Sequence, residues 1–207
     1  MNVYDFDKTI YPADSASHFW QFCVKRHPAA FLSLFRAAGP ALKLLRGEVA
    51  RGELKQAMFS CLKYTADPLA EAEAFWDAHI HRIYPWYLEQ KRSDDLVISA
   101  SPAFLISAAC RRLGIRCLAT EMDPATGRLL SPNCYGEEKP VRFRAACGDA
   151  HIDEFYSDSF SDSPMMLLAD RAFLIKKGRV IPVTDLPDSQ RKRVAALRQT
   201  REKGAGK

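Results

Sequence analysis

Short apolar segments alternate with helical patterns over much of the chain, and each apolar segment predicts a buried strand. Strands are expected at residues 2–6, 96–98, 115–119, 152–156, 173–175 and 180–183, and helices at residues 103–113, 141–147 and 164–169. Short apolar runs between turn residues are typical of strands covered on both faces. Because strands that alternate with helices form parallel sheets, we expect an α/β fold with a three-layer, Rossmann-like core.

A long helical pattern separates the first predicted strand from the second. Apolar residues recur at helical spacing from about residue 14 to residue 90, and Asp67 before Pro68 is typical of a helix start. This pattern predicts four or five helices. We therefore expect an all-helical cap at residues 12–90, inserted into a core formed by residues 1–11 and 91–187. The turn-rich residues 120–136 predict a β-hairpin or a loop.

The amino-acid composition favours a globular protein over a membrane-spanning or disulfide-bonded one. The chain has 207 residues, of which 47% are hydrophobic and 27% are charged, a balance typical of globular proteins. No apolar stretch is long enough to cross a bilayer, and the N-terminus does not resemble a secretory signal. The six cysteines form no Cys-x-x-Cys pair, which favours reduced thiols over disulfides or a zinc site. These features predict a cytoplasmic protein.

The formal net charge of +5 is unevenly distributed. Residues 189–207 carry a net charge of +6, so the other residues together carry −1. Residues 188–207 are therefore predicted to form a basic tail, either a solvated terminus or an electrostatic tether to an anionic membrane surface or to nucleic acid. Nucleic acid binding by the whole protein is not favoured. The cap also has a basic part, since residues 12–63 contain eight basic and three acidic residues.

Polar side chains follow the predicted strands at the end where ligands bind in open α/β sheets. The residues concerned are Asp5, Asp7 and Thr9 after the first strand, Ser99 and Ser101 after the second, and Asp158 and Asp162 after the strand at residues 152–156. Carboxylates gathered from two strands repel each other unless a cation is present, and oxygen ligands at this density suit Mg²⁺. A magnesium site is expected at this edge of the sheet.

The order of these residues resembles the haloacid dehalogenase-like phosphohydrolases. Asp5-Phe6-Asp7-Lys8-Thr9 is similar to motif one of that family, Ser99 to motif two, Lys139 to motif three, and Asp158 through Asp162 to motif four. A helical insert directly after motif one resembles the C1-type cap of the phosphoserine-phosphatase-like subfamily IB. Two departures are Lys8, where glycine is commonest, and Ser157, where glycine usually precedes the first motif-four aspartate.

The resemblance implies a catalytic role for three of these residues. Asp5 is the expected nucleophile, which forms an aspartyl-phosphate. Asp7 is the expected acid and base, because it must protonate the leaving oxygen and then activate water. Lys139 is expected to neutralise charge on the phosphoryl group. The dehalogenases of this family lack the second motif-one carboxylate. The presence of Asp7 therefore argues against cleavage of carbon–halogen bonds.

The resemblance also implies the binding residues. Ser99 and Lys139 are expected to bind the substrate phosphate, with Thr9 and Ser101 as helpers. Mg²⁺ is expected on the Asp5 carboxylate, the Asp7 main-chain carbonyl and Asp158, with Asp162 bound through water or orienting the other ligands. Lys139 also has charged neighbours in the sequence, so a solvated surface position is its alternative reading.

The function implied is Mg²⁺-dependent hydrolysis of a phosphomonoester, either a small metabolite or a lipid head group. Phosphoserine-like metabolites, phosphocholine, phosphoethanolamine and phosphatidylglycerol phosphate all remain open. One alternative is a phosphotransferase that uses the same aspartyl-phosphate with an acceptor other than water. Another is a membrane- or RNA-tethered binding module with a vestigial site, although carboxylates kept together without a metal would be costly. The oligomeric state stays undetermined.

Overall fold

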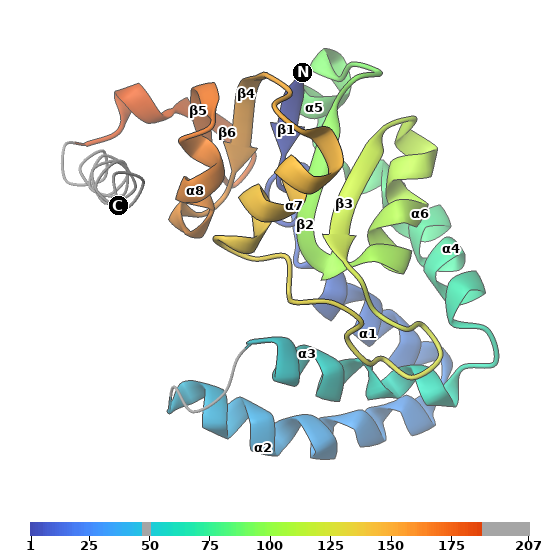
Figure 1. Ribbon diagram of the computed structural model, residues 1–207. Helices are drawn as coiled ribbons and strands as arrows, with labels where there is room; N and C mark the ends of the chain where they lie inside the picture. Colours follow the sequence, from blue (N-terminus) through green and yellow to red (C-terminus); the bar gives the residue numbers. More distant parts are fainter. Residues whose placement is uncertain (47–50, 188–207) are drawn as a thin grey trace.

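A six-stranded sheet forms the centre of the computed structural model, which describes residues 1–46 and 51–187 (Figure 1). The strands lie in the order β3-β2-β1-β4-β5-β6. They are β1 (Asn2–Tyr4), β2 (Leu96–Pro102), β3 (Arg116–Thr120), β4 (Ile152–Ser157), β5 (Ala169–Lys176) and β6 (Arg179–Pro182). Neighbouring strands from β3 to β5 are parallel, and β6 pairs with β5 antiparallel. The predicted α/β, Rossmann-like fold is confirmed, with one antiparallel edge strand.

Side chains of the central strands alternate between two hydrophobic clusters, one on each face of the sheet. Val3 and Ile98 belong to the cluster that contains Phe143, while Tyr4 and Val97 belong to the other. Helices cover both faces, which makes the three layers. The helices that follow the cap in sequence are α6 (Ala103–Leu113), α7 (Glu138–Cys147) and α8 (Ser163–Met166), with 3₁₀ helices η4 (Phe160–Asp162) and η5 (Val183–Asp185).

The segment between β1 and β2 is helical, as the sequence predicts. Its α-helices are α1 (Ser15–Arg26), α2 (Ser33–Leu45), α3 (Arg51–Phe59), α4 (Pro68–His79) and α5 (Pro85–Gln90), and its 3₁₀ helices are η1 (Pro28–Leu32), η2 (Ser60–Tyr64) and η3 (Ile80–Arg82). The Asp67 carboxylate accepts hydrogen bonds from the Leu69 and Ala70 N–H groups, at 3.0 Å each, so it caps α4 as expected.

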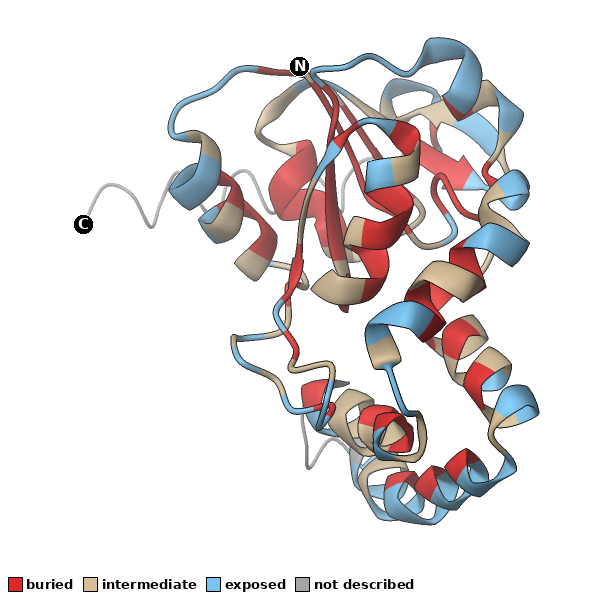
Figure 2. Cartoon of the chain, turned by 90° about the vertical axis from the view of Figure 1, so that its right-hand side faces the viewer, coloured by how far each residue is buried: buried red, intermediate tan, exposed pale blue. Residues whose placement is uncertain are grey.

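This helical segment is joined to the sheet by a shared core. Phe75 and Trp76 of α4 lie in the same cluster as Tyr4 and Val97, and the Trp76 indole donates a 2.7 Å hydrogen bond to the Leu105 carbonyl of α6. Helices α2 and α3 lie away from the sheet, at the bottom of the molecule in Figure 1, and Figure 2 shows the molecule from the side, coloured by burial. Because the core continues across residue 90, the domain boundaries at residues 12 and 90 stay predictions.

Several elements are longer than the sequence pattern predicts. Strand β2 continues to Pro102 instead of ending at residue 98, and β5 begins at Ala169, which the pattern assigned to a helix. Helix α7 begins at Glu138 instead of residue 141, so Lys139 lies in its first turn. Pro140 is tolerated there because the first N–H groups of a helix have no intrahelical acceptor. These differences place Ser99, Ser101 and Lys139 on regular elements.

Residues 121–137 form an irregular excursion that reaches from β3 to the cap. The segment contains a single isolated bridge, Met122 with Leu129, within the described residues, so it is a loop and not a regular hairpin. The Leu129 N–H donates a 2.8 Å hydrogen bond to the Gln56 side chain of α3. Gly127 adopts φ +73°, and a Cβ added there would lie 2.5 Å from the Phe59 carbonyl oxygen. The excursion therefore docks closely on the end of α3.

Three other sequence-based expectations concern the cysteines, membrane-spanning segments and the C-terminal tail. The six cysteines are free thiols. In the described part of the chain, no helix has the length and apolar character needed to cross a bilayer. The predicted basic tail at residues 188–207 lies outside the described residues, so its role stays a prediction.

Gly127→Ala is expected to destabilise the protein by about 2–4 kcal/mol, because it adds a close contact with Phe59 to the cost of a left-handed backbone. The matched control is Gly114→Ala, since Gly114 has φ +68° and open space around its Cβ position. That control should lose only about 1–2 kcal/mol. Urea unfolding of the two variants measures the difference, and equal losses would contradict the docked contact.

Candidate active site

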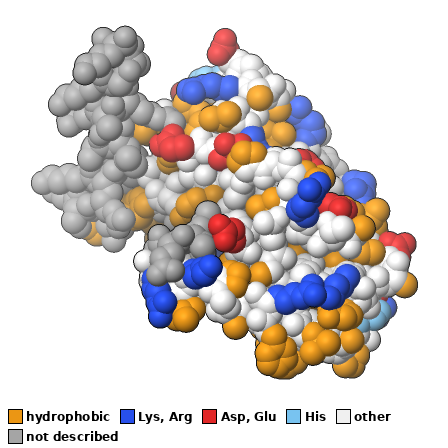
Figure 3. All heavy atoms as spheres, turned by 60° about the horizontal axis from the view of Figure 1, so that its bottom comes forward, with side chains coloured by type: hydrophobic (Ala, Val, Ile, Leu, Met, Phe, Trp, Pro, Cys, Tyr) orange, Lys and Arg blue, Asp and Glu red, His pale blue; other side chains and the backbone are white. Residues whose placement is uncertain are grey.

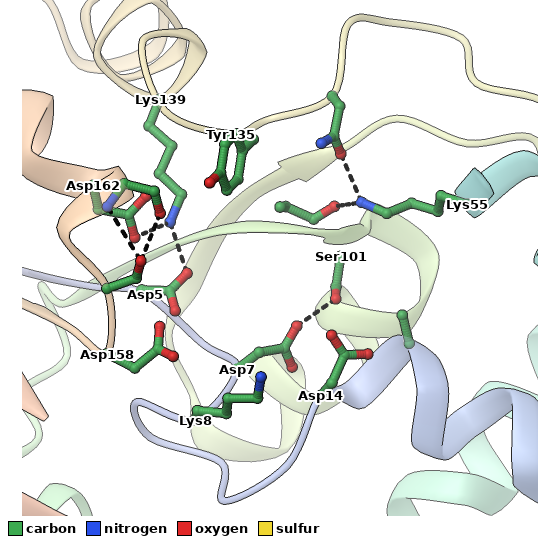
Figure 4. A pocket seen from close by; sticks show the side chains of 15 residues that line it. Asp5, Asp7, Lys8, Asp14, Lys55, Ser101, Tyr135, Lys139, Asp158 and Asp162 are labelled. Atoms are coloured by element: carbon green, nitrogen blue, oxygen red, sulfur yellow. Dashed lines mark hydrogen bonds and ion pairs between the residues drawn. The ribbon is translucent and has the colours of Figure 1, made fainter. Parts of the chain in front are cut away.

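A cavity of about 310 Å³ lies at the carboxyl ends of β1, β2 and β4. Strand β1 lies between β2 and β4, which is where the strand order reverses direction and where open α/β sheets bind ligands. The lining residues are Asp5, Asp7, Lys8, Asp14, Ala16, Lys55, Ala100, Ser101, Asn133, Tyr135, Lys139, Asp158, Ser159, Ser161 and Asp162 (Figure 4). The cavity wall is thus mostly polar and charged, and cap and core both contribute to it.

Asp5 lies at the end of β1 with both carboxylate oxygens hydrogen bonded. Its N–H donates to the Tyr156 carbonyl of β4 at 2.8 Å, which fixes its position beside that strand. Oδ1 accepts from Lys139 Nζ at 2.7 Å, and Oδ2 accepts from the Thr9 hydroxyl at 3.0 Å. Burial raises the pKa of Asp5 to about 7, although the Lys139 cation lowers it. Additional positive charge at the cavity would favour the ionised form that a nucleophile requires.

Lys139 is a buried cation between two carboxylates. Its side chain reaches from the first turn of α7, and its ammonium lies 2.7 Å from both Asp5 and Asp162. The Ser157 hydroxyl donates a further 2.8 Å hydrogen bond to Asp162 Oδ2. Burial by itself lowers the pKa of Lys139, but the two carboxylates raise it well above its usual value. Lys139 is therefore charged, and the surface alternative drawn from its charged sequence neighbours is wrong, because only 1% of it is exposed.

The Asp7 carboxylate turns away from Lys139 and toward the cap. Oδ2 accepts a 2.5 Å hydrogen bond from the Ser101 hydroxyl, and Oδ1 accepts a 2.7 Å bond from the N–H of Ser15, the first residue of α1. Burial raises the pKa of Asp7 to about 6, and the charge of Asp14 raises it as well, while the two hydrogen bonds lower it. A carboxyl group with this pKa can hold or release a proton near neutral pH.

The turn between Asp5 and Thr9 uses an unusual backbone conformation. Lys8 has φ +57°, the left-handed region that glycine adopts most easily, so the position is one where the family's common glycine would be unstrained. The Thr9 hydroxyl lies behind this turn and accepts a 3.0 Å hydrogen bond from the Asp158 N–H. Thr9 thereby ties the loop after β1 to the loop after β4.

The structure brings six of the predicted site residues to the cavity wall. These are Asp5, Asp7, Ser101, Lys139, Asp158 and Asp162. Thr9 and Ser99 are buried behind that wall. The Ser99 hydroxyl accepts a 3.0 Å hydrogen bond from the Ser101 N–H, so in this geometry it holds the end of β2 in place.

Three of the carboxylates near the predicted metal site are already bound by other groups of the protein. Across residues 1–46 and 51–187, no three Asp, Glu, His or Cys side chains are grouped so that they alone could hold a metal ion. The reason is that Lys139 holds Asp5 Oδ1 and Asp162, while the Asp7 carboxylate faces Ser15 and Ser101.

The remaining oxygen donors still fit Mg²⁺. Asp5 and Asp158 carry carboxylates that line the same cavity, and Figure 4 shows the two side chains one above the other on the left of the view. Burial raises the pKa of each of them, so a cation between them would offset a real electrostatic cost. Mg²⁺ commonly uses one or two carboxylates and completes its shell with water and substrate phosphate. The Asp7 main-chain carbonyl is the third donor that the resemblance implies.

The sequence analysis assigned no side-chain role to four residues that shape the site. Ser15 and Ser157 hold Asp7 and Asp162 through the hydrogen bonds given above. Lys55 enters the cavity from α3, where its ammonium bonds the Ala100 carbonyl and lies 2.6 Å from Asn133 Oδ1. The helix start at Ser15 was a usable signal for an anion-binding N–H group, whereas no local pattern pairs Lys55 with Asn133, 78 residues away.

The sequence matches the haloacid dehalogenase-like hydrolase family over residues 3–167, which is most of the chain. The chain therefore belongs to this family, and the expectation of a hydrolase of this superfamily is confirmed. A comparison with curated protein sequences gave no match.

Solved structures share the fold at low sequence identity. A protein with unknown function from Bordetella pertussis Tohama I has a TM-score of 0.70 and 22% identity, over 83% of this chain and 87% of that chain. A probable phosphoserine phosphatase from Vibrio cholerae has a TM-score of 0.59 and 12% identity, over 83% of this chain and 55% of that one. A phosphoserine phosphohydrolase-like protein from Francisella tularensis has a TM-score of 0.54 and 15% identity, over 83% and 86%. The resemblance to phosphoserine-phosphatase-like proteins thus holds for the fold.

Lys139→Met should destabilise the protein by about 3 kcal/mol or more at pH 7, because it leaves Asp5 and Asp162 buried without their cation. Adding Asp162→Asn should recover part of that loss, since it removes one of the two uncompensated charges. The free energy of unfolding of wild type, of Lys139→Met and of the double variant is measured by chemical denaturation at the same pH. If the double variant is no more stable than Lys139→Met, the ion pair does not account for the loss.

Proposed function

We propose that this protein is a Mg²⁺-dependent phosphomonoester hydrolase that acts through an aspartyl-phosphate. The observation that carries the proposal is that Asp5, Asp7 and Lys139 line one cavity. In the proposed reaction Asp5 is the nucleophile, Asp7 carries the proton, and Lys139 is a fixed cation. Membership of a hydrolase family supports it, as does the fold shared with the Vibrio cholerae protein named as a probable phosphoserine phosphatase.

In the first step, a carboxylate oxygen of Asp5 attacks phosphorus. A bond from that oxygen to phosphorus forms, and the bond from phosphorus to the ester oxygen breaks. The hydrogen bonds from Lys139 and Thr9 fix the rotation of the Asp5 carboxylate, so little reorganisation is needed at the moment of attack. Lys139 also places positive charge beside the phosphoryl oxygens.

Asp7 carries the proton in both steps. Its raised pKa keeps a useful fraction of the carboxyl group protonated, so it can donate a proton to the leaving ester oxygen. In the second step the Asp7 carboxylate accepts a proton from the water that attacks phosphorus, which releases phosphate and restores Asp5. Ser15 and Ser101 hold both Asp7 oxygens, so the group stays directed at the same region.

Asp5, Asp158 and the Asp7 main-chain carbonyl would hold Mg²⁺. When bound, the metal would supply positive charge that favours ionised Asp5 and neutralises the phosphoryl oxygens. Asp162 orients Lys139 from the far side. The role of Asp162 in this proposal is therefore indirect.

The substrate class is a small phosphomonoester. The cavity volume of about 310 Å³ lies at the lower end of the range for small-molecule sites, and its wall carries Lys55, Asn133 and Tyr135 beside the catalytic residues. These polar groups suit a polar leaving group. The cap contributes Lys55, so closure of the cap over the substrate would complete the site and limit access of water.

Asp5→Asn should lower phosphate release by about 10⁴-fold or more, because the amide is neutral and a poor nucleophile. The assay measures inorganic phosphate from a panel of phosphomonoesters that includes phosphoserine, phosphocholine and phosphoethanolamine. Asp170→Asn is the matched control, since Asp170 lies at the start of β5, away from the carboxyl ends of the strands. Residual activity of Asp5→Asn near that of the control would exclude Asp5 as nucleophile. Added alcohol acceptors in the same assay separate hydrolysis from phosphotransfer.

Chelation of divalent cations should lower phosphate release by about 100-fold or more, since several kcal/mol of charge stabilisation would be lost. Mg²⁺ added back should restore activity, whereas Ca²⁺ should not, because Ca²⁺ requires more ligands at longer distances than this site offers. The measurement is phosphate release with EDTA and then with each ion in excess. Full activity in EDTA would contradict the metal assignment.

A further inference from the structure

The outer surface of the cap, formed by η1 and α2, has a concentration of exposed apolar side chains. Of the eleven large hydrophobic side chains that are exposed among the described residues, six lie in this stretch, namely Phe31, Leu32, Leu34, Phe35, Leu42 and Leu45. Phe35 is 72% exposed and Leu45 is 86% exposed. Exposed apolar side chains are ordinary when scattered, but their collection on one short segment indicates an interaction surface.

These side chains do not face the interior of the cap, because a different face of α2 does. Ser33 and Ala37 are buried, and the Ser33 hydroxyl accepts a 2.8 Å hydrogen bond from the Trp20 indole. At 3.6 residues per turn, Leu34, Phe35, Leu42 and Leu45 fall within about 100° of one another on the helix surface. The exposed apolar face of α2 is therefore a continuous stripe.

Basic side chains border this stripe. Arg36, Lys43 and Arg46 are exposed, and Arg36 and Lys43 lie one above the other because they are seven residues apart. Residues 28–46 contain no acidic residue. Figure 3, which brings the bottom of the molecule forward, shows hydrophobic side chains gathered along the lower edge next to Lys and Arg side chains. The surface is thus apolar and positively charged at once.

We propose that the exposed face of α2 docks on an anionic lipid membrane. Charge complementarity decides the occupant: an anionic bilayer attracts the three basic residues and accepts the apolar stripe at the level of its head groups. A second copy of this chain would bring the same positive charges against each other. With 13 residues, α2 is about 20 Å long, too short to cross a hydrocarbon core of about 30 Å, so it lies in the plane of the interface.

The experiment is sedimentation of the full-length protein with vesicles of phosphatidylcholine alone or with about one third phosphatidylglycerol. Wild type should bind the anionic vesicles and bind the neutral vesicles at least about tenfold more weakly. Phe35→Ser/Leu45→Ser should weaken anionic binding by about tenfold or more. Arg36→Gln/Lys43→Gln should also weaken it by about tenfold, and added salt should weaken wild-type binding.

Matched control variants remove exposed apolar or basic side chains that lie outside α2. Leu88→Ser/Leu130→Ser removes two exposed apolar side chains outside α2, and Arg116→Gln/Arg144→Gln removes two exposed charges. Both controls should bind like wild type, and unchanged melting temperatures show that each variant is folded. Absence of vesicle binding by wild type, or equal binding by the α2 variants and their controls, would overturn the proposal. Concentration-dependent dimers that Phe35→Ser/Leu45→Ser abolishes, without vesicle binding, would assign the surface to a second copy.

Discussion

Electrostatic repulsion among buried carboxylates is the constraint on which the arrangement of this site depends. A parallel sheet brings the ends of β1 and β4 together, and both loops there carry aspartates. Lys139 lies between Asp5 and Asp162 and makes two 2.7 Å contacts, so one cation offsets two of the negative charges. Removing one partner of a buried ion pair is costly, because it leaves the other charge without compensation. The Lys139 side chain, which extends from α7, is therefore needed to keep the two aspartates together.

The carboxylates of Asp5 and Asp7, to which we assign separate roles in the proposed reaction, have different surroundings. Asp5 is held by an ammonium and a hydroxyl group, whereas Asp7 is held by a helix N–H group and a hydroxyl group. Both of these Asp7 partners are neutral, and its raised pKa allows it to exchange a proton near neutral pH. Two aspartates that are two residues apart thus acquire separate roles from the elements packed against them.

The helical segment between β1 and β2 contributes to the cavity wall and also carries the exposed apolar side chains of η1 and α2. Lys55 of α3 lines the cavity, and the excursion at residues 121–137 docks on the same helix through Gln56 and Phe59. Helix α2 lies on the outer side of the cap, with its apolar and basic face turned to the surroundings. Helices α2 and α3 pack directly on each other. This pair of helices therefore joins the cavity wall, through α3, to the exposed apolar and basic face of α2.

The sequence by itself determined the α/β class, the helical insert and the positions of Asp5, Asp7, Asp158 and Asp162, because short-range patterns carry that information. Alternation of apolar segments and polar residues at strand ends can be read within a few residues. Tertiary structure alone decided that β2 continues to Pro102, that α7 begins at Glu138, and that Ser99 supports the site from behind. The pairing of Lys55 with Asn133 and the docking of Gly127 on Phe59 also required the fold, since contacts between distant residues depend on packing that no local pattern encodes.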